Sequence, residues 1–110
     1  MLTANDYQNK ASSTAIYPDM GNNLTYTVLG LLGESGEVAE KLKKLVRDEG
    51  GVLTDSYREK IALELSDVAW YLAMTAYELD YSLEEIMQMN LDKLASRAER
   101  GVLSGSGDNR

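Results

Sequence analysis

Two short acidic pairs carry the chemistry that this sequence suggests, Glu34-Ser-Gly-Glu37 and Glu64-Leu-Ser-Asp67. Each pair lies in a stretch with helical character, and residues three apart on a helix share one face at about 5–6 Å. Two like charges at that spacing disfavour an isolated helix, but hard cations such as Mg²⁺ bind carboxylate oxygens. If the two helices face each other, the four carboxylates form a box. The spacing therefore predicts a site for divalent cations.

A solvated helix surface is the simpler alternative, because glutamates are seldom buried without a partner. Two features favour a site. The second pair has apolar neighbours, namely Ile61, Ala62, Leu63, Leu65, Val68, Ala69, Trp70 and Leu72. On a helical wheel Gly30 and Gly33 fall beside the first pair, although each glycine costs about 1 kcal/mol relative to alanine in a helix. Their missing side chains would let a ligand or another backbone approach.

Composition limits the other kinds of chemistry. The chain has 110 residues, enough for one domain, and contains neither cysteine nor histidine. This excludes disulfides, zinc sites of the usual kind and Ser-His-Asp catalysis. It also argues against a metal-carboxylate oxidase, which uses Glu-x-x-His ligands. Carboxylates, lysine, arginine, tyrosine and the backbone remain.

Charge and hydropathy limit the partners. A net charge of −7 argues against binding a polymeric nucleic acid, which needs clustered lysine and arginine. No apolar run approaches the ~20 residues that span a bilayer, and the N-terminus lacks a signal-peptide pattern. We therefore expect a cytoplasmic protein with no membrane partner.

Capping signals and apolar periodicity predict four helices, over residues 3–15, 24–49, 56–80 and 83–98. Thr3, Asn22 or Asn23, Ser56 and Ser82 are the expected N-caps. The middle of the third helix is apolar nearly all round, which implies burial on more than one side. A second subunit would supply the other wall most easily. We therefore expect an all-α, four-helix fold assembled as a homodimer or a dimer-of-dimers tetramer.

Three further segments could contact a ligand. Asn90, Lys93 and Arg97 share one helical face that suits a phosphate chain, with a solvated surface as the alternative. Trp70 suits a core or an interface first, and base stacking second. Residues 101–110 have the composition of a flexible tail. That tail nevertheless ends in groups suited to a nucleotide, Asp108, Asn109 and Arg110.

The acidic pairs in their contexts, GLLGESGEVAEKLKKLVRD and ELSDVAWYLA, resemble the MazG-like all-α nucleoside triphosphate pyrophosphohydrolases. The closing segment NLDKLASRAERGVLSGSGDNR resembles the short, single-domain forms common in phages. The resemblance implies one MazG-like domain over residues 1–110, in the host cytoplasm if phage-encoded. It also implies hydrolysis of a (deoxy)nucleoside triphosphate to the monophosphate and pyrophosphate, which would control a nucleotide pool.

The resemblance also implies roles for residues. Mg²⁺, with Mn²⁺ as a possible substitute, would be held by Glu34, Glu37, Glu64 and Asp67. Glu34 or Glu37 would accept the proton of the attacking water. The substrate would be contacted by Lys60, Trp70, Asn90, Lys93, Arg97, Asp108, Asn109 and Arg110. The alternative is a non-catalytic, acidic helical protein-interaction module.

Overall fold

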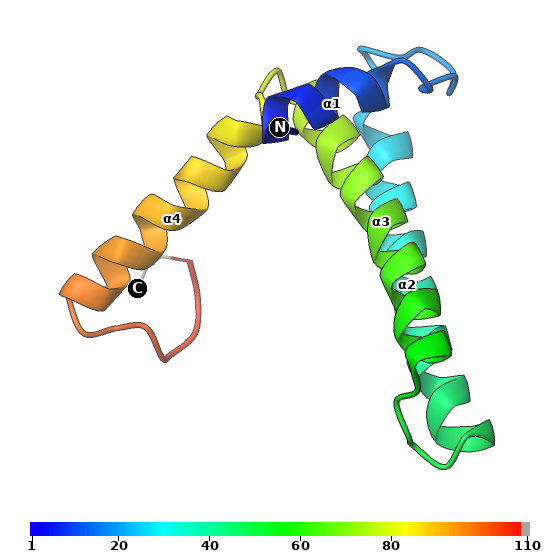
Figure 1. Cartoon of the computed structure of the whole chain (residues 1–110). Coiled ribbons are helices and arrows are strands. Elements are labelled where there is room, and N and C mark those ends of the chain that lie inside the picture. Colours follow the sequence, from blue (N-terminus) through cyan, green and yellow to red (C-terminus); the bar gives the residue numbers. More distant parts are fainter. Residues whose placement is uncertain (109–110) are drawn as a thin grey trace.

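The computed structural model describes residues 1–108, and in this range all regular structure is α-helical (Figure 1). The helices are α1 (Ala4–Ser12), α2 (Leu24–Asp48), α3 (Asp55–Glu78) and α4 (Leu83–Glu99). The prediction of four helices and no strands is confirmed for this part of the chain. Asn109 and Arg110 lie outside the described residues.

Three of the expected N-caps are confirmed. Thr3 and Ser82 form capping boxes, and the Asn23 side chain accepts a hydrogen bond from the backbone N–H of Tyr26. The cap of the third helix was predicted wrongly. Thr54 has extended backbone angles and its Oγ1 accepts from Tyr57 N at 3.2 Å, so α3 begins before Ser56.

Two predicted helix ends were too long. α1 ends at Ser12 rather than at residue 15, because the hydroxyls of Ser12, Ser13 and Thr14 bond to backbone carbonyls three residues back. Such local bonds compete with continuation of a helix. α3 ends at Glu78 rather than at residue 80, since Asp80 adopts a left-handed backbone conformation (φ 61°).

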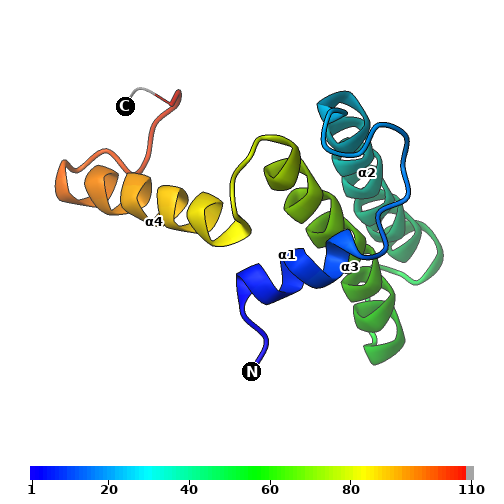
Figure 2. The same ribbon diagram turned by 90° about the horizontal axis from the view of Figure 1, so that it is seen from above.

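The helices form an open structure rather than a closed bundle. α2 and α3 run antiparallel as a hairpin, α1 crosses one end of it, and α4 leads away from it (Figures 1 and 2). Among the described residues α4 contacts α1 and α3 but not α2. The radius of gyration is 16.8 Å, whereas a compact domain of this length has about 13 Å. None of the helices in residues 1–108 has both the length and the apolar character needed to cross a bilayer.

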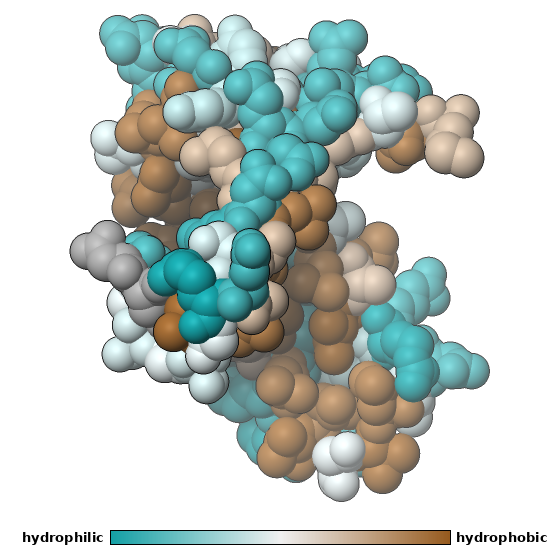
Figure 3. Space-filling view, turned by 90° about the vertical axis from the view of Figure 1, so that its left-hand side faces the viewer, coloured by the Kyte–Doolittle hydropathy of each residue, from teal (hydrophilic) through white to brown (hydrophobic). Residues whose placement is uncertain are grey.

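The buried core is small and lies where α1, the α1–α2 loop and α3 meet. It contains Ala11, Tyr17 and Met74, with Tyr7 and Trp70 packed against it. Many large apolar side chains remain exposed in the single chain, as the brown areas of Figure 3 illustrate. The expected burial of the α3 middle on more than one side is therefore not reached within one chain: Leu63 and Leu65 are 62% and 53% exposed, whereas Val68, Ala69 and Trp70 are half-buried.

Glu78 holds the loop between α1 and α2. Its carboxylate accepts hydrogen bonds from the Tyr17 hydroxyl (2.6 Å), Gly21 N (3.0 Å) and Asn23 N (3.3 Å). Partial burial alone would raise the pKa of Glu78, but these hydrogen bonds hold it below the ordinary value. The loop that leads into α2 is thus fixed by a charged acceptor.

We expect Glu78→Gln to lower the free energy of unfolding by about 1.5–3 kcal/mol at pH 7, the usual range for hydrogen bonds to a charged group. Because the folded pKa is lowered, this stability is present above the ordinary glutamate pKa of about 4.3 and is lost as the pH falls below it. Urea unfolding followed by circular dichroism at pH 7 and pH 3 measures both effects. The control is Glu59→Gln, an exposed residue on the same helix. Equal losses in the two variants would contradict the role of Glu78.

Candidate active site

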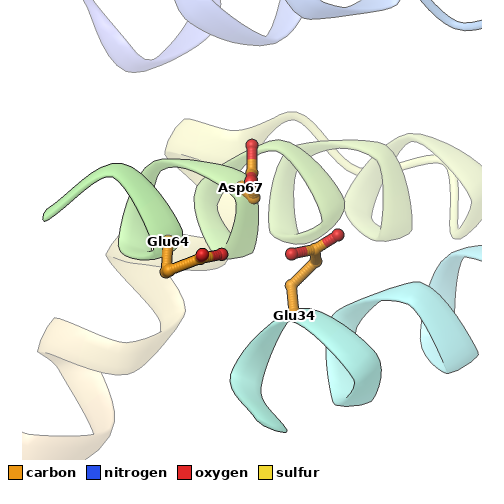
Figure 4. Close-up of side chains that lie close together, drawn as sticks. All are labelled: Glu34, Glu64 and Asp67. Atoms are coloured by element: carbon orange, nitrogen blue, oxygen red, sulfur yellow. The ribbon is translucent and has the colours of Figure 1, made fainter. Parts of the chain in front are cut away.

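Three carboxylates converge where α2 and α3 face each other (Figure 4). Glu34 comes from α2, and Glu64 and Asp67 come from successive turns of α3. One carboxylate oxygen of each lies within 4.8 Å of the others. The structure therefore brings three of the four predicted metal ligands together across the helix pair.

The donor set fits a hard divalent cation. Mg²⁺ binds oxygen ligands in an octahedron at about 2.0–2.1 Å, so two of its ligands lie about 3 Å apart when adjacent and about 4 Å apart when opposite. Oxygens within 4.8 Å of one another reach those separations by moves of about 1 Å, within the reach of side-chain rotation. All three donors are carboxylates, and these oxygen ligands suit Mg²⁺ and Mn²⁺ better than they suit softer metals.

The electrostatics of the cluster also favour a cation. Glu34 is half-buried. Loss of contact with water is the largest cause that raises its pKa, and the negative charges of Asp67, Glu64 and Glu37 raise this pKa further. A bound cation would offset both effects, because it attracts the charged form of the carboxylate.

Glu37 is placed differently from the other three. It is exposed, and it is not among the carboxylates whose oxygens lie within 4.8 Å of one another. Its charge still acts on Glu34, one turn away on the same helix. The prediction of Glu37 as a fourth ligand therefore stays a prediction, with Glu37 beside the cluster.

Lys41 is a residue of this site that was not expected from the sequence. Its Nζ lies 3.8 Å from Glu64 Oε1, and both side chains are largely covered. Lys41 follows Glu37 by four residues, so it continues the same helical stripe by one turn. That spacing was available in the sequence. The ammonium group supplies the positive charge that the cluster otherwise lacks.

Two tyrosines also border the cluster and were missed. Burial raises the pKa of Tyr71, with contributions from a hydrogen bond to Tyr26 and from the charges of Glu34 and Asp67. Burial and the charge of Asp67 likewise raise the pKa of Tyr7 in α1. Tyr71 follows Asp67 by one helical turn, which is the signal that could have identified it.

The predicted substrate residues on α3 lie at different depths. Lys60 is exposed one turn before Glu64, with its Nζ 4.8 Å from the centre of the Tyr57 ring. Trp70 packs in the core region and donates its Nε1–H to Thr14 Oγ1 at 3.1 Å. The first expectation for Trp70, packing, matches this position.

The predicted substrate residues of the fourth helix lie on α4, which leads away from the α2–α3 hairpin that carries the carboxylates (Figure 1). Asn90 and Lys93 are exposed and line a shallow cavity of about 350 Å³. Arg97 is only 5% exposed. Its Nη2 donates to the backbone oxygen of Asp108 (3.4 Å) and lies 3.9 Å from the Asp108 carboxylate. Residues 101–108 thus fold back over α4, whereas Asn109 and Arg110 lie outside the described part.

Comparisons with known proteins point to one family. The family model of the MazG nucleotide pyrophosphohydrolase domain matches residues 22–102. Gene 37 protein of Mycobacterium phage L5 is 50% identical over 109 residues, an alignment that covers 94% of this chain and 96% of that relative. No solved structure matches the chain.

We expect millimolar Mg²⁺ to raise the melting temperature of the wild-type protein, because a ligand that binds only the folded state stabilises it. Glu34→Gln should melt about 2–4 °C higher than the wild type without the cation, since it removes like-charge repulsion, and should lose the shift with Mg²⁺. Differential scanning fluorimetry measures both. NaCl at matched ionic strength controls for screening. An equal shift with NaCl would argue against a specific cation site.

Proposed function

Because the chain belongs to the family of MazG nucleotide pyrophosphohydrolase domains, we propose that it hydrolyses a (deoxy)nucleoside triphosphate to the monophosphate and pyrophosphate, and so controls a nucleotide pool. The observation that carries the proposal is the cluster of Glu34, Glu64 and Asp67, with oxygens within 4.8 Å of one another on facing helices. A polyanionic substrate needs positive charge to approach this acidic chain, which has a net charge of −7.

The proposed cofactor is Mg²⁺, with Mn²⁺ as a substitute. Glu34, Glu64 and Asp67 would hold it, and Glu37 would be a ligand or a neighbouring base. When bound, the cation neutralises triphosphate charge and lowers the pKa of a water molecule. Lys41, at 3.8 Å from Glu64, would either leave that carboxylate or turn to a phosphate oxygen.

In the proposed reaction the oxygen of a water molecule attacks the α-phosphorus. The bond between this phosphorus and the oxygen that bridges to the β-phosphorus breaks, and that oxygen leaves with pyrophosphate. Glu34 or Glu37 accepts the proton of the water. Glu34 is suited by its place in the carboxylate cluster, and Glu37 is suited by its exposed position beside the cluster.

The proposed substrate contacts divide between two parts of the fold. Lys60 lies on the hairpin, one turn from Glu64, and can meet a phosphate there. Asn90 and Lys93 lie on α4, which does not contact α2. In a homo-oligomer, the partner's copy of α4 can bring these two groups to the carboxylates.

We further propose that the chain works as a homodimer or a dimer-of-dimers tetramer. The support is the apolar surface that a single chain leaves open. An apolar groove runs between α3, α4 and the start of α1 as two neighbouring cavities of about 420 and 570 Å³ that share Leu72 and Met87. Large apolar side chains on α2, α3 and α4 are exposed as well, and contiguous apolar surface on a single chain usually marks an interface. The proposed unit is one domain over residues 1–110, in which the segment 101–110 contacts substrate.

We expect Glu64→Gln and Glu37→Gln each to lower turnover by a factor of about 10² or more, because each removes charge from the cation site or its base. Pyrophosphate release from each canonical dNTP and NTP with Mg²⁺ is the measurement. Glu40→Gln, a change on the same helix at a residue outside the carboxylate cluster, should retain activity. If the wild type hydrolyses no nucleotide and gains no stability with Mg²⁺, the alternative of a protein-interaction module would be favoured.

A subunit-mixing experiment tests the shared site. Light scattering should first give at least twice the chain mass of 12.2 kDa. Glu64→Gln and Lys93→Ala should each be impaired alone. In randomly mixed dimers one site per heterodimer is intact, so roughly a quarter of the wild-type activity should return. No recovery after verified subunit exchange would place Lys93 and the carboxylates in the same chain.

A further inference from the structure

The helix pair that holds the carboxylates leaves no room for a side chain at Gly30. A Cβ atom built on Gly30 would overlap the Tyr71 ring, with Cε1, Cδ1 and Cζ as its nearest neighbours. The two other glycines of α2, Gly33 and Gly36, have no atom within 4 Å of such a Cβ. Gly30 is therefore the glycine of α2 at which the absence of a side chain decides how close α3 can lie.

This contact lies one helical turn from the carboxylate cluster on both helices. Gly30 precedes Glu34 by four residues, and Tyr71 follows Asp67 by four residues. Residues four apart are neighbours on one helix face. Any change in helix spacing or register at the contact is therefore transmitted over about 6 Å to the carboxylates.

The Tyr71 ring has little freedom to move out of the way. The Trp70 ring meets it edge-on with centroids 5.0 Å apart, and the Tyr26 ring lies 6.4 Å away. Trp70 is itself fixed by its hydrogen bond to Thr14. On the opposite side of this group, Tyr26 stacks on Tyr17 at 4.9 Å. A side chain at Gly30 would have to displace either this aromatic cluster or α3.

We propose that Gly30 and Tyr71 are positioning residues: the ring seated on the bare backbone of Gly30 sets the α2–α3 spacing and thereby the separation of Glu34 from Glu64 and Asp67. The inference rests on the proposed function, because it assigns this contact a role in cation binding. The role belongs to the ring and not to the hydroxyl group. Neither residue needs to touch the cation or the substrate.

Mn²⁺ affinity of the full-length chain, measured by electron paramagnetic resonance, tests the inference without reference to turnover. Gly30→Ala should weaken Mn²⁺ binding by about tenfold or more, in the range found when residues that support metal ligands are changed. The matched control is Gly36→Ala, on the same helix with open space around it, which should bind Mn²⁺ within about twofold of the wild type. Circular dichroism establishes that each variant is folded at the temperature of measurement.

Changes at Tyr71 keep the test decisive if Gly30→Ala does not fold. Tyr71→Phe preserves the ring and should keep the affinity within about threefold, whereas Tyr71→Ala should weaken it. In the Tyr71→Ala background, a further Gly30→Ala should add little, because the overlap is gone, and the two effects should be non-additive.

The outcomes separate this inference from the proposed function. If the wild type binds Mn²⁺ and Gly30→Ala binds it equally well, the positioning role is wrong and the cation site stands. The same conclusion follows if Tyr71→Phe and Tyr71→Ala bind Mn²⁺ alike. If the wild type binds neither Mn²⁺ nor Mg²⁺, the proposed function fails and the positioning role fails with it.

Discussion

The structure depends on a helix contact that must hold like charges together. α2 and α3 place three carboxylates within 4.8 Å of one another, and Glu34 is partly removed from water. Repulsion at this distance opposes the packing of the two helices. The apolar and aromatic contacts along the same helix pair must therefore exceed it, and Lys41 offsets part of it at Glu64. A cation would turn the same repulsion into attraction, so that binding and stability are coupled at this interface.

The rest of the chain divides into a supported half and an exposed half. The core joins α1 and the α1–α2 loop to the C-terminal half of α3. Hydrogen bonds to Glu78 also hold the loop against that helix. α4 has no comparable support, since it contacts α1 and α3 near its start and leaves α2 untouched. A chain of this length buries only about 60–70% of its unfolded surface even when compact. An open chain buries less, and this is the physical argument for a partner subunit.

Sequence reasoning succeeded where the determinants are local. Capping boxes at Thr3 and Ser82 placed two helix starts, and i, i+3 spacing paired Glu64 with Asp67 on one face. It failed where two signals compete within a few residues, as at Thr54 and Ser56, since only the backbone angles decide which one caps the helix. The orientation of the helices relative to one another could not be predicted from the sequence either. Nothing in the sequence of α4 fixes its angle to the hairpin, because that angle depends on contacts distant along the chain.

The α4 residues show how tertiary position separates groups that share a helical stripe. Asn90, Lys93 and Arg97 are equivalent by spacing, yet only the first two are exposed. Arg97 is buried and pairs with Asp108 in the segment that follows α4. To bind a phosphate, the Arg97 guanidinium would first have to release the Asp108 carboxylate. The exposed ammonium group of Lys93 can contact a phosphate directly. Arg97 is therefore better placed to order the segment around Asp108 than to make the first contact with a substrate, and Lys93 is the α4 cation available for that contact.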